Sequence, residues 1–123
     1  MSNKPLAESG FHALYRRYKA KSKIRGYKFT LTKLQFKELT SSNCFYCNRL
    51  PSMISYDSSV KNTKETSYTY NGIDRVNNKI GYTNGNVVAC CKKCNEWKRA
   101  MPVKEFVQTI HKVSNFLKSK GFK

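Results

Sequence analysis

The chain has 123 residues, enough for one domain with a modest hydrophobic core, and 24 Lys and Arg residues against 7 Asp and Glu residues give it a formal net charge of +17. A positive field of this strength attracts polyanions, and nucleic acid is the commonest of them. A membrane surface is the rival polyanion, and a charge that only aids solubility is the third interpretation. No segment is apolar for long enough to span a bilayer, and the first ten residues lack the apolar run of a signal peptide, so we expect an intracellular protein.

The N-terminal segment is predicted to form a basic amphipathic helix from about Pro5 to Lys23. Aromatic and apolar residues recur in it at helical spacing, at Phe11, Leu14, Tyr15 and Tyr18. Between positions 11 and 37 the chain has nine basic residues and no acidic one, which favours contact with phosphate over a merely solvated face. The predicted phosphate-contacting residues here are Arg16, Arg17, Lys19, Lys21, Lys23 and Arg25.

A second, short helix is predicted after Gly26. Thr32-Lys33-Leu34-Gln35 has the form of a capping box, which opens a helix through about Leu39 with Leu31, Leu34, Phe36 and Leu39 on its apolar side. Residues 52–66 are polar and show no periodicity, so they are interpreted as a mobile loop or insertion.

The second half of the chain has the pattern of a strand, a loop, a strand and two helices. Residues 68–76 are predicted to form a strand interrupted by Asn71-Gly72, and residues 86–89 a second strand after a loop. A helix should begin near Cys91 and end before Pro102, and its Trp97 is expected in the core rather than stacked on a base. A long amphipathic helix with apolar residues at Val103, Phe106, Val107, Ile110, Val113 and Leu117 is predicted to close the domain.

Two Cys-x-x-Cys pairs, Cys44/Cys47 and Cys91/Cys94, predict a structural zinc site. Zinc takes four ligands in a tetrahedron, and a two-residue spacer lets one turn present both thiolates to the same ion. A redox dithiol and unliganded thiols are the alternatives. The fifth cysteine, Cys90, is most simply a small buried residue that ends a strand.

These motifs follow one another in an order that resembles the HNH endonucleases, particularly the small free-standing enzymes of bacteriophages. The residues that carry the resemblance are Cys44-x-x-Cys47, Gly72-Ile73-Asp74-Arg75-Val76-Asn77-Asn78, Gly81-Tyr82-Thr83, Asn86-Val87-Val88 and Cys91-x-x-Cys94-Asn95-x-x-Lys98. The resemblance implies a single α+β domain over residues 1–123, with a zinc-stabilised ββα-metal core at 43–101. A basic helical extension at 1–42 and a C-terminal amphipathic helix at 102–118 would flank that core.

The resemblance also implies a catalytic divalent ion that is separate from the zinc. By position, Asp74 and Asn95 would be ligands of Mg²⁺ or Mn²⁺, which prefer oxygen donors, and Asn86 would pin the loop between the strands. Lys98, one helical turn after Asn95, and its neighbour Arg99 would contact phosphate.

Arg75 stands where the family's histidine activates the attacking water. A guanidinium stays protonated and cannot act as that base. Arg75 could clamp phosphate in a working variant, or it could mark a degenerate nuclease that only binds, or one that nicks slowly, since a general base contributes about 10²–10⁴-fold. The two histidines, His12 and His111, fall outside the motif and are expected to be solvated or capping residues.

The implied function is metal-dependent hydrolysis of DNA phosphodiester bonds, giving a nick or a double-strand break. A catalytically weak or inactive zinc-stabilised DNA-binding protein on the same scaffold is the alternative. Double-stranded DNA is the expected partner, and RNA remains open because positive charge does not discriminate between them. The sequence leaves the target site and the oligomeric state open.

Overall fold

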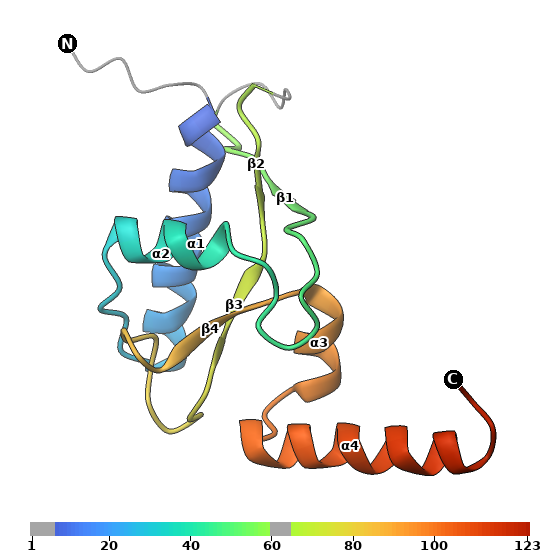
Figure 1. The fold of residues 1–123 in the computed structure, drawn as a ribbon. Helices are drawn as coiled ribbons and strands as arrows, with labels where there is room; N and C mark the ends of the chain where they lie inside the picture. Colours follow the sequence, from blue (N-terminus) through green and yellow to red (C-terminus); the bar gives the residue numbers. More distant parts are fainter. Residues whose placement is uncertain (1–6, 60–64) are drawn as a thin grey trace.

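The computed structural model describes residues 7–59 and 65–123, which form four helices and four short strands in an α+β arrangement (Figure 1). None of the described helices is long and apolar enough to cross a membrane. In chain order the elements are α1 (Ala7–Arg25), α2 (Lys33–Thr40), β1 (Met53–Ser55), β2 (Tyr68–Tyr70), β3 (Gly72–Arg75), β4 (Val87–Cys90), α3 (Lys92–Lys98) and α4 (Val103–Ser119).

The predicted basic helix is present as α1. The predicted start at Pro5 lies outside the described residues, and the helix continues to Arg25, two residues beyond the predicted end. It stops there because Gly26 adopts a φ of +77°, a left-handed conformation that ends helices and suits glycine.

The hydrophobic core lies between α1, α2 and the antiparallel pair β3–β4. Phe36 of α2 is fully buried, and its ring packs edge-on against Tyr15 and Tyr18 of α1 at centroid distances of 5.3 and 5.2 Å. The aromatic stripe of α1 therefore faces inward and leaves its basic residues on the other faces. The buried core residues are Phe11, Leu14, Tyr15, Leu31, Phe36, Ile73 and Val87.

The capping box at the start of α2 is confirmed. Thr32 Oγ1 accepts the Gln35 backbone N–H at 3.1 Å, and Gln35 Oε1 accepts the Thr32 backbone N–H at 2.9 Å. The predicted apolar side of this helix was wrong at Leu34, which is 68% exposed. The inward face carries Phe36, as predicted, and Thr40, which is four residues later.

Residues 68–76 form two strands in different sheets rather than one interrupted strand. β2 pairs antiparallel with β1, and β3 pairs antiparallel with β4. The loop interpretation of residues 52–66 is therefore wrong for β1, while residues 60–64 lie outside the described part. The switch between sheets occurs at Asn71, which is fully buried and donates from its side-chain amide to the carbonyls of Ser42 and Arg49 at 3.0 and 3.1 Å.

Helix α1 touches the β1–β2 sheet at Gly10. The Gly10 N–H donates to the Thr66 carbonyl at 2.9 Å, and its carbonyl accepts the Ser55 hydroxyl at 2.8 Å. A Cβ at this position would meet the backbone, including the Tyr68 nitrogen at 2.7 Å. A glycine inside the helix thus allows the two backbones to meet.

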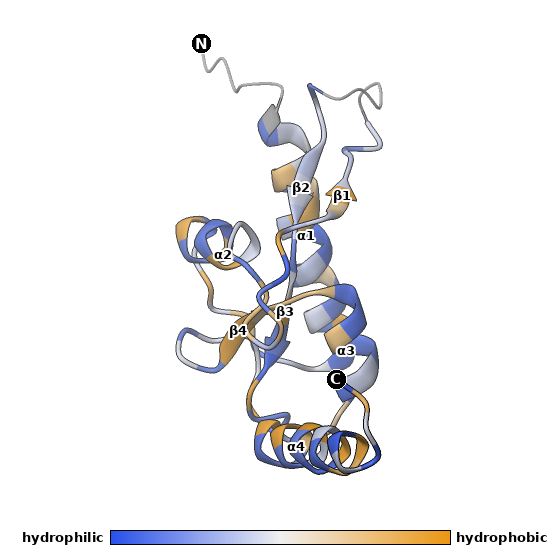
Figure 2. Ribbon diagram, turned by 45° about the vertical axis from the view of Figure 1, so that its right-hand side comes forward, coloured by the Kyte–Doolittle hydropathy of each residue, from blue (hydrophilic) through white to orange (hydrophobic). Residues whose placement is uncertain are grey.

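Helix α4 lies at the end of the molecule away from the start of α1, and Figures 1 and 2 agree on this placement. Of its residues only Phe106 is buried, where its ring packs edge-on against Tyr46 at 5.2 Å. The prediction that α4 closes the core holds for Phe106 alone, because Ile110 and Val113 are 42% and 51% exposed.

We predict that Gly10→Ala destabilises the protein. Alanine normally stabilises a helix interior relative to glycine, but here its Cβ would overlap the backbone of β1 and β2, at a cost of about 1–3 kcal/mol. Urea unfolding measures the effect, with Lys23→Ala on an exposed face of the same helix as the control. An increase in stability of Gly10→Ala would contradict the close approach.

Candidate functional site

The sulfur atoms of Cys44, Cys47, Cys91 and Cys94 converge on one point. They all lie within 4.8 Å of one another, and the Cys47 and Cys91 sulfurs are 3.6 Å apart. Four thiolates at about 2.3 Å from a zinc ion would be about 3.8 Å apart in a tetrahedron, which matches this spacing. The four cysteines could therefore hold a zinc ion. Cys90 lies outside the set and is buried at the end of β4, as the sequence predicts.

Backbone hydrogen bonds close the turn that carries the first cysteine pair and fix it against β4. The Phe45 N–H donates to the Ala89 carbonyl and the Cys44 N–H to the Arg49 carbonyl, both at 2.8 Å. Burial raises the pKa of the Cys44 thiol, but backbone N–H groups around it outweigh burial and lower the pKa to about 7. A thiol with such a pKa is readily deprotonated, as a metal ligand must be.

The second cysteine pair starts helix α3. Cys91 is the residue that caps the helix, and its sulfur accepts the Cys94 backbone N–H at 3.4 Å. The inward face of this short helix carries Cys94 and Lys98, which are four residues apart and both buried. Asn95, directly after the last cysteine, is exposed.

Asp74, in β3, is a buried carboxylate with two partners on the same oxygen. Its Oδ2 accepts the Tyr46 hydroxyl at 2.7 Å and lies 3.0 Å from the Lys98 ammonium. The Lys98 side chain is fully buried, and its ammonium makes no well-aligned hydrogen bond within the described residues, so the Asp74 charge is its compensation. Burial and the neighbouring carboxylate raise the pKa of Tyr46, so its phenol stays protonated and donates to Asp74.

A pocket of about 550 Å³ opens beside Asp74, between α1, β3 and α3. From α1 it receives Arg17, Lys21 and Arg25, which recur every four residues and so share one face of the helix. From the other elements it receives Asp74, Arg75, Asn95 and Arg99. The pocket therefore combines five basic side chains with one carboxylate, and no imidazole is among its lining residues.

Arg75 is held in place on the pocket wall. Its Nη1 donates to the Asn78 carbonyl at 2.7 Å, and its guanidinium carbon lies 3.7 Å from the centre of the Tyr27 ring. These contacts tie the loop after β3 to the segment after α1. Because guanidinium stays protonated, Arg75 contributes a fixed positive charge to the pocket.

Asn86 holds the loop between β3 and β4 from the inside. Its side-chain oxygen accepts the Asn77 N–H at 2.9 Å, and its amide donates to the carbonyls of Asn77, Ile80 and Gly81 at 3.1, 3.2 and 2.9 Å. Asn86 is 7% exposed and does not line the pocket. The observed contacts are those of a residue that pins the loop.

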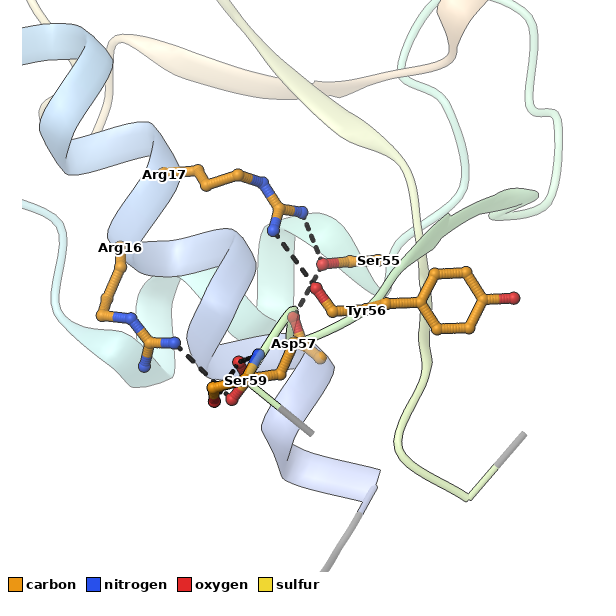
Figure 3. A network of polar contacts seen from close by, with 7 residues as sticks. Arg16, Arg17, Ser55, Tyr56, Asp57 and Ser59 are labelled. Carbon is orange, nitrogen blue, oxygen red and sulfur yellow. Dashed lines mark hydrogen bonds and ion pairs between the residues drawn. The ribbon is translucent and has the colours of Figure 1, made fainter. Parts of the chain in front are cut away.

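Two of the basic residues predicted to contact phosphate also attach α1 to the end of β1 and to the residues that follow it (Figure 3). Arg17 donates to the Ser55 hydroxyl at 2.6 Å and to the Tyr56 carbonyl at 3.3 Å, and Arg16 forms an ion pair with Asp57 at 3.7 Å. Arg17 nevertheless lines the pocket, whereas Arg16 does not.

Lys19 and Lys23 are exposed on α1 but do not line the pocket. The Lys19 ammonium lies 5.5 Å from the centre of the Tyr15 ring. The predicted basic face is thus divided. Lys21 and Arg25 are the α1 residues that line the pocket without also being attached to β1.

The chain is similar to known proteins both in sequence and in fold. No family model matches the sequence. An uncharacterized protein of Acanthamoeba polyphaga mimivirus is 38% identical over 104 residues, which is 85% of this chain but only 17% of the viral protein's length. The solved structure of PacI, described as a rare-cutting HNH restriction endonuclease that perturbs DNA, superposes over 92% of this chain and 82% of its own with a TM-score of 0.56 and 17% identity.

The chain has an HNH-type fold. The predicted α+β class is confirmed, with β3, β4 and α3 as the central unit and α1 and α4 flanking it. Within this fold Asp74, Arg75 and Asn95 come together in one pocket, although Asp74 and Asn95 are 21 positions apart. Neither His12, which lies 3.7 Å from Glu8, nor the exposed His111 lines that pocket.

Two residues of α3 in the HNH-type fold differ from their predicted positions. Lys98 was expected on the surface that faces phosphate, but it points inward to Asp74. Trp97 was expected in the core, but it is 67% exposed. Both differences have one cause, because the Cys94–Lys98 face of this short helix turns inward and places Trp97 outside.

Sequence reasoning missed Tyr46, which contacts Asp74, and Tyr27, on which Arg75 stacks. The position of Tyr46 inside the first Cys-x-x-Cys pair was the available indication, since that turn must lie close to the central strands of the HNH-type fold. Nothing comparable in the sequence indicates the role of Tyr27.

We predict one bound zinc ion per chain, held by the four clustered cysteines. Cys94→Ser should lose the zinc and much of its stability, because the metal joins the turn at 44–47 to the start of α3. Cys90→Ala is the matched control and should keep its zinc. Zinc released into a colorimetric chelator measures the stoichiometry, and a fully stable, zinc-free wild-type protein would contradict the assignment.

We predict that Asp74 and Lys98 are strongly coupled in stability. Asp74→Asn leaves a buried ammonium without its counter-charge and should cost about 3–5 kcal/mol. Adding Lys98→Met should recover much of that loss, which a double-mutant cycle from urea unfolding measures. The pair Arg16 and Asp57, in which the arginine side chain is exposed and the charges are 3.7 Å apart, is the control and should be close to additive. Additive losses at Asp74 and Lys98 would contradict a buried pair.

Proposed function

We propose that the chain is a metal-dependent DNA endonuclease that hydrolyses phosphodiester bonds. The observation that carries the proposal is the meeting of Asp74 and Asn95 with five basic side chains in one pocket. The fold likeness to PacI, which is described as an HNH restriction endonuclease, also supports a nuclease. The proposed substrate is double-stranded DNA.

The residues of the pocket fit a hard divalent ion. Asp74 offers a carboxylate oxygen and Asn95 an amide oxygen, the donor types that Mg²⁺ and Mn²⁺ prefer. We assign these two residues as the ligands of the ion. When bound, the ion would neutralise the charge that develops on the scissile phosphate. Two protein ligands suit Mg²⁺, which usually keeps several waters and takes phosphate oxygens as further ligands.

The basic residues of α1 would bind the DNA backbone beside that ion. Arg17 and Arg25 are eight residues apart, which is about 12 Å along a helix, or three to four base-pair steps of about 3.4 Å measured along the axis of a DNA duplex. Lys21 lies between them on the same face. This row would hold one strand across the pocket, while Arg99 adds a charge from α3.

Arg75 would stabilise negative charge on the phosphate. Its guanidinium is already oriented by Asn78 and Tyr27, so little reorganisation would be needed when a phosphate arrives. It cannot accept the proton of the attacking water, and that proton would pass to solvent or to another side chain. In this proposal Arg75 binds phosphate and is not the base.

A second candidate function is DNA binding without cleavage. The observation that favours it is that the pocket has no imidazole among its lining residues, so the usual base is missing. The same row of basic residues would bind DNA in either case. Cleavage assays separate the two functions.

We predict that the wild-type protein nicks plasmid DNA in Mg²⁺ or Mn²⁺ and that Asn95→Ala slows nicking by at least about 10-fold, because a metal ligand is lost. Asn95 is the preferred test residue because it is exposed, whereas Asp74 substitutions also leave Lys98 unpaired. Asn115→Ala, an exposed asparagine on α4, is the control and should retain the wild-type rate. Gel electrophoresis of the nicked form measures the rate.

Absence of nicking in both metals, combined with tight binding of duplex DNA, would rule out the endonuclease and favour the second candidate. A single-stranded RNA of the same length in a parallel assay tests the choice of nucleic acid. Preferred cleavage of that RNA would contradict DNA as the substrate.

A further inference from the structure

Asp74 presents its two carboxylate oxygens to different surroundings. Oδ2 receives both the Tyr46 hydroxyl at 2.7 Å and the Lys98 ammonium at 3.0 Å. Oδ1 makes no hydrogen bond with the described residues, and Asp74 is one of the residues that line the pocket. One oxygen is thus engaged by the protein and the other is left for a ligand.

Tyr46 is itself held from several directions. It sits between the first two cysteines, and the N–H of its neighbour Phe45 donates to the Ala89 carbonyl at 2.8 Å. Its ring meets the Phe45 and Phe106 rings edge-on, each at a centroid distance of 5.2 Å. Ala89 is paired with Ile73, the residue before Asp74. These contacts place the Tyr46 hydroxyl at a fixed point relative to Asp74.

The two partners of Oδ2 act on the Asp74 carboxylate in different ways. Lys98 supplies the charge that compensates the buried carboxylate, but an ammonium has three donors about a rotatable bond and directs its partner weakly. The Tyr46 hydroxyl supplies a single donor on a rigid ring that is clamped by its neighbours. A hydrogen bond from such a donor restricts rotation of the carboxylate.

We propose that Tyr46 is a positioning residue for the divalent ion: its hydroxyl holds Oδ2 of Asp74 and so presents Oδ1 to the pocket. The proposal rests on the proposed function for the presence of that ion. It also gives the cysteine cluster a second role, because the turn that binds the structural metal carries the hydroxyl that orients the ligand of the catalytic metal.

The test compares wild type, Tyr46→Phe and the control Tyr56→Phe. Tyr46→Phe removes one oxygen and keeps the ring, so packing against Phe106 is retained, while Tyr56 is 40% exposed and lies outside the pocket. The first readout is the Mn²⁺ affinity of the protein bound to a short DNA duplex, followed by electron paramagnetic resonance of free Mn²⁺. The second is the Mn²⁺ concentration that gives half-maximal nicking.

We expect the Kd for Mn²⁺ of Tyr46→Phe to rise about 10-fold or more, as happens when a hydrogen bond to a metal ligand is removed. Zinc content and duplex affinity without Mn²⁺ should not change, and high Mn²⁺ should restore nicking. Phe106→Leu, which keeps the hydroxyl but loosens the ring, should shift the Kd for Mn²⁺ in the same direction by less. Tyr56→Phe should match wild type.

An unchanged Kd for Mn²⁺ in both Tyr46→Phe and Phe106→Leu would overturn the positioning role. Loss of zinc or of thermal stability without a shift in the Kd for Mn²⁺ would mean that Tyr46 is only structural, which also overturns it. Failure of the proposed function has a different outcome, because then the wild-type protein fails to nick. If wild type binds Mn²⁺ without nicking, the Mn²⁺ affinities alone decide the role of Tyr46. If it binds no Mn²⁺, both proposals fail.

Discussion

The convergence of four cysteine sulfurs is the constraint on which the rest of the site depends. Cys47 and Cys91 are 44 positions apart, and closing a loop of that length costs conformational entropy that a small core offsets poorly. A metal shared by both pairs would offset that cost. The cluster also decides where α3 begins, since Cys91 caps the helix. Tyr46 and Lys98, which hold Oδ2 of Asp74, and Asn95, which would share its ion, therefore all lie within four positions of a clustered cysteine.

The charged residues in and beside the pocket form two groups with different roles. Lys98 and Asp74 compensate each other inside the protein, where neither would be tolerated alone. The remaining charges of the pocket are the five basic side chains, so its field is positive and favours phosphate. The net charge of +17 therefore does more than attract polyanions in general, because part of it is concentrated around the pocket that contains Asp74.

Local patterns in the sequence predicted the four helices and β4, but they missed β1 and the separation of β2 from β3, and they did not show how each element faces its neighbours. The capping box at Thr32 depends on residues a few positions apart and is confirmed, and the four cysteines predicted to bind zinc lie close enough together to hold a metal ion. Asn71 was interpreted as a break within one strand, because its bonds to Ser42 and Arg49 are long-range and leave no periodic trace.

Nothing in the sequence indicated the orientation of α3 either. In a seven-residue helix every face is too short to show a pattern, so the inward turn of Cys94 and Lys98 depends on the cysteine cluster. The exposed position of Trp97 follows from that turn and not from its hydrophobicity. Asp74, Arg75 and Asn95 were placed by family resemblance, and the pocket brings them together. The hydrogen bond from Tyr46 that holds Asp74 could be identified only once the fold was known.

Arg75 has a structural role that is not apparent when it is regarded only as a replacement for the expected histidine. It joins the loop after β3 to Tyr27, while Asn86 holds the same loop from the inside. A histidine side chain is shorter, so it could not keep both the hydrogen bond to the Asn78 carbonyl and the stacking on Tyr27. Replacing Arg75 with histidine would therefore add a possible base and loosen a wall of the pocket at the same time. The arginine is thus part of how this pocket is built, whether or not the chemistry has also adapted to it.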